Sequence, residues 1–138
     1  MEVSEKIRNM LNRPGRIGIL ATSNEDGSPN AAVFGSAHMK DPSSLLVCTG
    51  NNRTFQNLRK NPKACLLVVT KAEGHPMEWE GYRLYLQATK TETEGNLLEE
   101  FKKQAAEAVG AEIADLLQAV IIFKVTDIRP LIDLAPGL

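Results

Sequence analysis

The first apolar pattern along the chain has a helical period. Residues 4–12 place three apolar side chains at i, i+3 and i+4 spacing, which predicts a short amphipathic helix that Ser4 caps. These side chains are Ile7, Met10 and Leu11. The sequence Arg13-Pro14-Gly15 is expected to end this helix.

Six later stretches have the apolar content or the alternation of β-strands and are separated by turn-forming residues. They cover residues 17–22, 30–38, 45–48, 64–70, 82–91 and 119–127. Asp26-Gly27 marks the first turn and "KDPSS" is expected to close the second strand. The best alternation is in residues 82–91, where Tyr82, Leu84, Leu86 and Ala88 share one side.

Two further helices interrupt the strands. Residues 53–60 form one, with Phe55 and Leu58 facing inward and Pro62 ending it. Residues 94–109 form the other, and a short turn over residues 112–117 follows Gly110. The predicted apolar stripe of the helix over residues 94–109 consists of Leu97, Leu98, Phe101, Ala105 and Val109. Six strands with peripheral helices and no βαβ alternation predict a mainly β protein, an antiparallel sheet closed into a small barrel.

Composition narrows the function classes. The 138 residues fit one domain, and a formal net charge of −1 with 5% aromatic residues argues against nucleic-acid binding. No apolar run approaches the ~20 residues of a membrane span, and the charged start "MEVSEKIRNML" does not resemble a signal peptide. Cys48 and Cys65 lie in apolar runs without zinc-ligand spacing, which predicts two buried hydrophobes in a reducing cytoplasm.

No catalytic motif stands out. The two histidines, His38 and His75, have no serine or cysteine elbow around them, and HExxH, Walker and GxGxxG patterns are absent. His38 is interpreted as a strand-end surface residue, and His75 lies in a turn-like loop. The carboxylates near the long helix suit its N-terminus and a solvated face, where Glu99 can pair with Lys102 or Lys103. They are Glu92, Glu94, Glu99 and Glu100. Catalytic residues stay unassigned, and no metal site is expected.

The stretch "TGNNRTFQNLRKNP" (residues 49–62) combines features of an anion site. Gly50 permits a backbone path that bulkier residues would resist, and the helix that follows starts with unpaired N–H groups. Arg53 supplies a fork of donors that suits phosphate, and Thr54 adds a hydroxyl. An alternative is that Asn52 or Thr54 is only the helix cap and that Arg53 is an ordinary surface residue.

Two blocks and the order of the elements decide between these interpretations. The blocks are "GRIGILATSNEDGSPNAAVFGSAHM" and "SLLVCTGNNRTFQNLRKNPKACLLV", and the second is the more specific. The chain, from its first helix to about Val125, resembles the FMN-binding split-barrel family, which includes pyridoxamine 5'-phosphate oxidase and small FMN-binding proteins. The resemblance implies one FMN-binding domain over residues 1–138, a six-stranded antiparallel split barrel of Greek-key type that forms a homodimer with FMN at the interface.

The resemblance also implies roles for particular residues. Arg53 and Thr54 would contact the FMN phosphate, Gly50 and Asn51 would line the turn beneath the ribityl chain, and Thr49 would lie at the edge of the pocket. The second strand would run along the flavin through Val33, Phe34, Gly35 and Ser36. Asn57 has two interpretations, since its amide could reach the phosphate or simply hold the loop to the helix. Trp79 could cover a flavin of either subunit or anchor its loop.

Two departures from the family pattern matter. The closing segment "DIRPLIDLAPGL" has one basic residue, Arg129, so the substrate-phosphate grip of pyridoxamine 5'-phosphate oxidases is missing and that activity is not expected. The segment "AAVFGS" lacks the basic residue that the family carries on this strand, so the phosphate would depend on Arg53 and the helix start.

Three functions fit these features. The first is a small cytoplasmic FMN oxidoreductase or electron carrier, with a nicotinamide or a redox protein as electron donor, because the presumed pocket holds no obvious acid or base. The second is an oxidase-like flavoenzyme with a specific small substrate. The third is a non-enzymatic binding module that uses a deazaflavin, heme or no cofactor.

Overall fold

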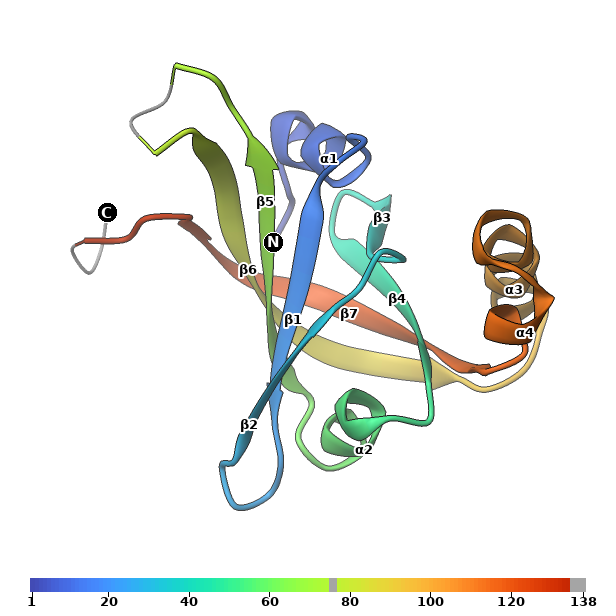
Figure 1. The fold of residues 1–138 in the computed structure, drawn as a ribbon. Helices are drawn as coiled ribbons and strands as arrows, with labels where there is room; N and C mark the ends of the chain where they lie inside the picture. Colours follow the sequence, from blue (N-terminus) through green and yellow to red (C-terminus); the bar gives the residue numbers. More distant parts are fainter. Residues whose placement is uncertain (75–76, 135–138) are drawn as a thin grey trace.

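The computed structural model describes residues 1–74 and 77–134 (Figure 1). The helices are α1 (Glu5–Leu11), α2 (Arg53–Lys60), α3 (Asn96–Val109) and α4 (Ala111–Ala114). The strands are β1 (Ile17–Ser23), β2 (Pro29–Val33), β3 (His38–Asp41), β4 (Ser44–Gly50), β5 (Lys63–Lys71), β6 (Trp79–Glu92) and β7 (Leu117–Pro130). The predicted helices and five of the six predicted strands are present, with boundaries that differ by a few residues, and the predicted strand over residues 30–38 is divided into β2 and β3.

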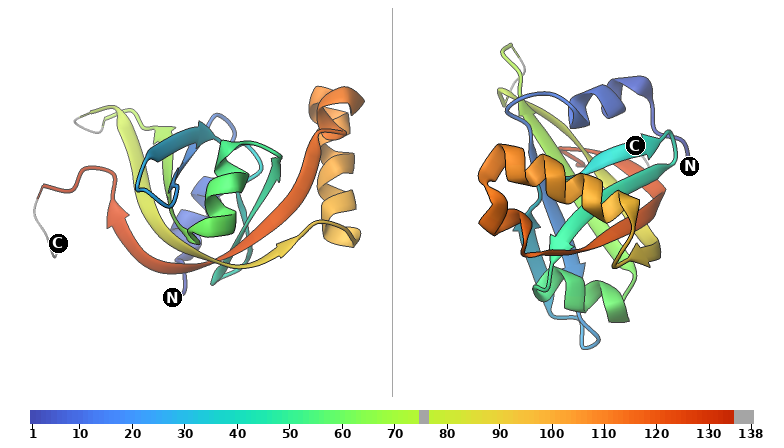
Figure 2. Two further views of the ribbon diagram at one scale, coloured as in Figure 1. Left: turned by 90° about the horizontal axis from the view of Figure 1, so that it is seen from below. Right: turned by 90° about the vertical axis from the view of Figure 1, so that its right-hand side faces the viewer.

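The strands form one antiparallel sheet in the order β2-β1-β5-β6-β7-β4-β3. The neighbours β4-β7-β6-β5 have the spatial order of a Greek key, as expected. The long strands β6 and β7 curve along one side of the molecule and continue toward α3 and α4 (Figure 2). This curvature wraps the sheet around a core. The helix α2 lies near one end of the curved sheet (Figure 2).

The prediction of six strands is wrong because residues 30–38 do not form one strand. β2 ends at Val33, and β3 begins at His38. Between them the Phe34 N–H donates to the Gly18 carbonyl (2.8 Å), and the Phe34 side chain turns into the core. The connection over residues 34–37, here called the β2–β3 link, therefore leaves the sheet. Also, β3 includes Lys40 and Asp41, so the turn falls later than "KDPSS" suggested.

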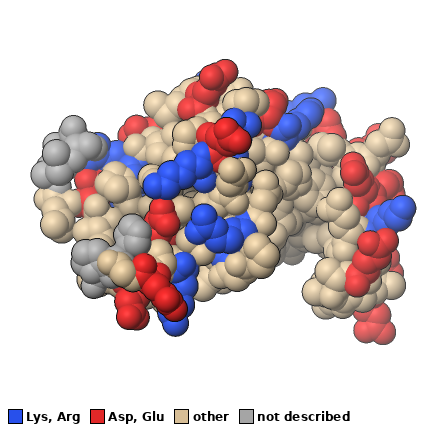
Figure 3. Space-filling model, turned by 90° about the horizontal axis from the view of Figure 1, so that it is seen from above, with Lys and Arg blue, Asp and Glu red and all other residues tan. Residues whose placement is uncertain are grey.

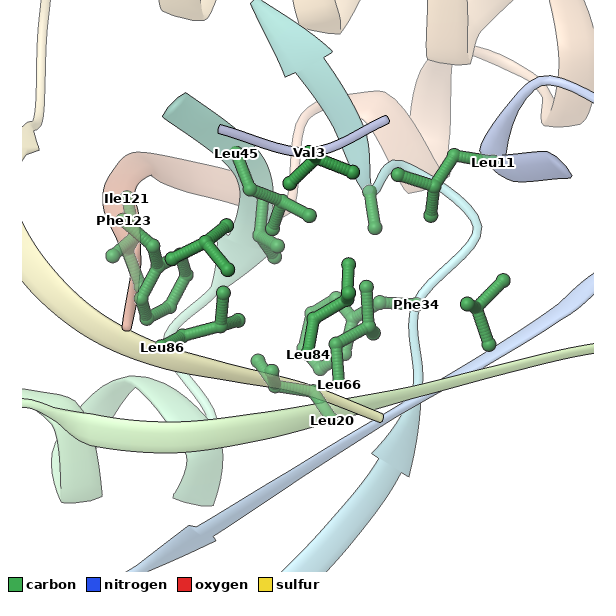
Figure 4. Packing of buried hydrophobic residues seen from close by; sticks show 14 of the residues in the cluster. Val3, Leu11, Leu20, Phe34, Leu45, Leu66, Leu84, Leu86, Ile121 and Phe123 are labelled. Carbon is green, nitrogen blue, oxygen red and sulfur yellow. The ribbon is translucent and has the colours of Figure 1, made fainter. Parts of the chain in front are cut away.

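One hydrophobic core fills the inside of the curved sheet (Figure 4). Leu20, Leu66 and Leu84 on the three neighbouring strands are fully buried, as are Leu45 and Phe123 from the other side. Side chains of this size contribute about 1.5–3 kcal/mol each when they leave water. On α1 the predicted apolar face, Ile7, Met10 and Leu11, is buried, and the Ser4 hydroxyl accepts from the Ile7 N–H (3.3 Å).

A second, smaller cluster attaches α3 to the outer face of β4 and β7. Leu98 and Phe101 pack there on Leu46, Cys48 and Val120. The predicted stripe on this helix is only partly correct, because Val109 at its C-terminal end is 61% exposed. The helices α3 and α4, here called the arm, project beside the barrel (Figures 1 and 2).

In the described part of the chain, no helix has the length and apolar character that a membrane crossing needs.

Candidate functional site

Asn52 caps the N-terminus of α2. Its side-chain oxygen accepts from the Phe55 N–H (3.0 Å) and from the Thr49 hydroxyl (3.1 Å), which identifies Asn52, and not Thr54, as the cap. The Asn52 carbonyl accepts from the Gln56 N–H (3.0 Å). These contacts fix the direction in which the first turn of the helix points.

Two backbone donors stay open at this end. The N–H groups of Arg53 and Thr54 have no partner within the helix and make no other hydrogen bond in the described chain. The Arg53 side chain is exposed and has neither an ion pair nor a hydrogen bond to a described residue. The guanidinium and the N–H group of Arg53 belong to an exposed residue at a helix start, where an anion is favoured, whereas the unpaired Thr54 N–H belongs to a buried residue.

Thr54 is oriented differently from Arg53. It is 1% exposed, and its hydroxyl accepts from the Asn30 side chain (3.3 Å). Its hydroxyl joins α2 to β2, and its backbone N–H, although unpaired, is buried with the rest of the residue. Asn51 is exposed, and its side-chain oxygen accepts from Gln56.

Asn57 is buried and connects α2 to the sheet. Its amide donates to the Thr22 hydroxyl on β1 (3.1 Å), and 5% of the residue is exposed. This contact favours the interpretation in which Asn57 holds the helix in place.

We expect Asn57→Ala to lower the free energy of unfolding by about 1–3 kcal/mol, because the Thr22 hydroxyl is left buried and unpaired. FMN affinity should change less than about twofold if the contact is structural. Urea unfolding and a flavin titration measure the two quantities. A variant with unchanged stability and lost FMN binding would instead assign the amide to the phosphate.

Gly50 has a steric role. A Cβ at this position would lie 2.8 Å from the Leu116 carbonyl oxygen, where the chain enters β7. Its φ is not positive, so the reason for glycine is the close approach of the arm's base and not an unusual turn. Gly50 therefore sets how closely the arm approaches the end of β4.

A groove of about 790 Å³ lies between the β2–β3 link with β4 on one side and the arm on the other. Figure 3 shows a hollow with largely uncharged walls beside the arm. Six of the predicted cofactor residues line the groove, namely Val33, Phe34, Gly35, Ser36, Thr49 and Gly50. Asn52 lines it too, so the start of α2 lies at its edge, whereas Asn51, Arg53, Thr54 and Asn57 do not line it.

The β2–β3 link contributes to the groove partly through its backbone. The Ser36 hydroxyl donates to the Cys48 carbonyl and accepts from the Cys48 N–H, both at 3.1 Å, which attaches the link to β4. Phe34 points into the core, so mainly its backbone is available to a ligand. Val33, in contrast, is 71% exposed at the rim of the groove.

Two groove residues were missed by sequence reasoning. Arg16 donates from Nε to the Leu11 carbonyl and from Nη2 to the carbonyls of Gly35 (3.0 Å) and Ala37 (3.1 Å). Burial lowers the pKa of Arg16. Nothing in the sequence marks Arg16, because its partners are backbone carbonyls, two of them 19 and 21 residues away.

His38 is the second missed residue. The predicted strand-end position is correct, since β3 begins at His38, but the residue is half-buried, lines the groove and lies against the Phe101 ring (centroids 5.2 Å apart). His38 therefore adds to the groove an ionisable side chain that sequence reasoning did not place there. The contact spans 63 positions of the chain, so a local pattern could not indicate it.

The two cysteines are free thiols. Cys48 is buried in the groove wall, and burial raises its pKa to about 11, so it stays protonated at neutral pH. Cys65 is only half-buried on β5, which corrects the expectation that both are core residues. Burial raises the pKa of the Cys65 thiol too.

The acidic residues near α3 form no site. Glu94, Glu99 and Glu100 are exposed, and Glu92 pairs with Lys90 (3.1 Å). Glu99 makes no ion pair with a described residue, so the suggested contact to Lys102 or Lys103 is not present. Within residues 1–74 and 77–134, no three metal-ligating side chains come together.

The remaining candidates are Trp79 and His75. Trp79 begins β6, is 43% exposed and does not line the groove of its own chain. His75 lies outside the described residues.

Comparison with known proteins gives a consistent result. The family model described as pyridoxamine 5'-phosphate oxidase matches residues 3–131. No curated protein matches the sequence.

Three solved structures illustrate the similarity in fold. An FMN-binding protein from Syntrophomonas wolfei subsp. wolfei is 22% identical with a TM-score of 0.78, over 95% of this chain and 87% of that one. An F420 reductase is 16% identical (TM-score 0.68; 92% and 98% covered). HutZ, the heme storage protein from Vibrio cholerae, is 18% identical (TM-score 0.63; 94% and 96% covered). At these identities the likeness concerns the fold.

Proposed function

Because the chain belongs to the pyridoxamine 5'-phosphate oxidase-like family of split barrels, we propose that it is an FMN-binding flavoprotein that transfers hydride or electrons. One observation carries this proposal: a groove of about 790 Å³ opens beside a helix N-terminus with two unpaired N–H groups and an unpaired arginine in the described chain. The volume lies within the roughly 300–1,000 Å³ of typical ligand sites.

The residues present fit the parts of FMN. Arg53 would hold the phosphate through its guanidinium and its N–H group, and the Thr54 N–H could join only if the first turn of α2 opens, because Thr54 is buried. Thr49, Gly50 and Asn51 would border the ribityl chain, and the backbone of the β2–β3 link would face the ring. When bound, the flavin supplies the redox chemistry, while the chain binds the ring, orients it and excludes water.

The proposal includes a homodimer. The outer face of β2, β1, β5 and β6 supports it and would form the interface. The strand register puts Val33 opposite Ile19 and Ile19 opposite Leu67, and the next row contains Ala31, Ala21, Cys65 and Tyr85. All are exposed or half-buried, so the face is largely apolar and uncovered. A second copy with the same face would cover it in a two-fold arrangement. This face is continuous with Val33 at the rim of the groove, so the partner would close the groove.

We expect Ile19→Glu to convert the dimer to a monomer and to weaken FMN binding, because it places a charge between Val33 and Leu67 in the apolar face, one strand away from Arg83, which pairs with Leu67. Size-exclusion chromatography with light scattering measures the mass. Thr89→Glu, which adds the same charge farther along the outer side of β6, is the control and should stay dimeric. A wild-type protein that is monomeric at micromolar concentration contradicts this part of the proposal.

Oxidation of pyridoxamine 5'-phosphate is not part of the proposal. The sole basic side chain after Lys124 belongs to Arg129, and it forms a two-pronged ion pair with Asp133 (2.6 Å for each contact). That arginine is already matched to a carboxylate and is a poor candidate for a substrate phosphate. A nicotinamide or a redox protein is the proposed electron donor, and two free thiols suit a reducing cytoplasm.

The test is the identity of the cofactor that accompanies the native protein. Protein purified without added cofactor is denatured, and the released small molecule is identified by mass and absorbance. FMN is the expected result. Heme or a deazaflavin would support the alternative binding modules, and apoprotein that takes up no FMN would refute the proposal.

A further inference from the structure

His38 occupies a defined place in the groove. It is the first residue of β3, pairs with Leu46 on β4 and lines the groove opposite the arm. Its ring is tilted by 42° against the Phe101 ring of α3. The imidazole is therefore held between the sheet and the arm, next to the space that the proposed function assigns to the flavin and its reaction partner.

The hydrogen bond of His38 fixes which nitrogen is available. Nδ1 lies 3.0 Å from the Ser36 carbonyl oxygen. A carbonyl only accepts hydrogen bonds, so Nδ1 must carry a proton in this contact. In the neutral ring Nε2 is then a bare acceptor, and in the cationic ring Nε2 carries the proton that can leave.

Nε2 is also accessible. It makes no hydrogen bond within the described chain, yet it is not among the buried unpartnered atoms there. Since His38 lines the groove, a ligand in the groove can approach this atom.

The other groove residues are unsuited to proton transfer near neutral pH. Among described residues the groove wall has no carboxylate and no lysine. The Cys48 thiol, with a pKa of about 11, stays protonated, and Arg16 spends its Nε and Nη2 donors on backbone carbonyls. Histidine is the residue type that changes charge between pH 5 and 8.

We propose that His38 is a catalytic residue that donates a proton from Nε2 to an electron acceptor bound in the groove, an inference that rests on the proposed FMN function. The acceptor class is a compound that takes up two electrons and two protons, such as a quinone. The acceptor would receive a hydride equivalent from the anionic reduced flavin, which returns to its oxidised form, and one proton from Nε2 of the imidazolium, which becomes neutral. The neutral imidazole regains its proton from water, while the Ser36 carbonyl keeps Nδ1–H in place.

The experiment compares wild type with His38→Asn, whose amide can still donate to the Ser36 carbonyl but has no group at the place of Nε2. FMN-loaded protein is reduced with dithionite without air and then mixed with menadione, which needs protons, or with ferricyanide, which takes electrons only. General acid catalysis contributes roughly 10²–10⁴-fold, so the menadione rate should fall at least about 100-fold. The ferricyanide rate should change less than about twofold. Equal effects on both acceptors, or none on either, would overturn the assignment.

A second readout does not need the flavin. ¹⁵N NMR of the imidazole in the apoprotein should show the neutral ring with its proton on Nδ1. A proton on Nε2 would overturn the role of His38 alone. Absence of FMN uptake would instead overturn the proposed function, and the hydride source with it, so the two failures are distinguishable.

Discussion

Replacing Arg53 with alanine is expected to weaken FMN binding by about 10- to 150-fold. A hydrogen bond to a charged group contributes about 1.5–3 kcal/mol, and each 1.4 kcal/mol corresponds to a factor of ten in affinity. The effect should be this large because no second basic side chain on β2 shares the phosphate. The backbone N–H groups of the helix start remain in the variant, so weak binding should persist.

Arg59→Ala is the matched control for this variant. Arg59 is in the last turn of the same helix, and its Cζ lies 5.7 Å from the centre of the Phe55 ring. Both substitutions remove one positive charge, so a general electrostatic effect would appear in both. Flavin fluorescence titration at several salt concentrations measures the affinities. Equal affinities of the two variants for FMN would contradict the phosphate role of Arg53.

Gly81→Ala is expected to have the largest effect on stability. Gly81 pairs with Val69 in the β5–β6 ladder, and a Cβ there would clash with the Val68 carbonyl oxygen. The obstacle is backbone at the centre of a sheet, so no side-chain rotation relieves it. We expect the free energy of unfolding to fall by more than about 3 kcal/mol.

Gly35→Ala provides the control for the loss of glycine itself. Gly35 lies in the β2–β3 link, where a Cβ would meet no atom within 4 Å and φ is not positive. Its urea unfolding midpoint as apoprotein should stay close to that of the wild type. A Gly81→Ala protein with an unchanged midpoint would mean that β5 and β6 are farther apart than the structure has them.

The sequence predicted the helices and strands best in segments where the apolar residues follow a single period, helical or strand-like. α2 begins at Arg53 and ends at Lys60 as expected, because a polar turn, two inward apolar residues and Pro62 all define it locally. The break after Val33 could not be predicted in this way. Residues 30–38 have the composition of a strand, and they leave the sheet because Phe34 enters a core that distant segments build.

The candidate site likewise contains residues that the sequence could indicate and residues that it could not. Thr49, Gly50 and the start of α2 are neighbours in the sequence, so one motif suggested them together. Arg16 joins the groove through its contact with the β2–β3 link, and His38 lies there against Phe101 of the arm. The fold brings the link and the arm together although they are far apart in the sequence. Local patterns carry no information about such contacts, and the register of the sheet is what reveals them.

The most direct measurement of the central claim compares FMN with riboflavin in titrations of the wild-type apoprotein. The two ligands share the ring and the ribityl chain and differ in the phosphate. We predict that FMN binds one per chain and at least about tenfold more tightly than riboflavin, and that Arg53→Ala removes most of this difference. Equal affinities of the wild type for FMN and riboflavin, or no binding of either, would contradict the assignment of the α2 N-terminus as the phosphate site.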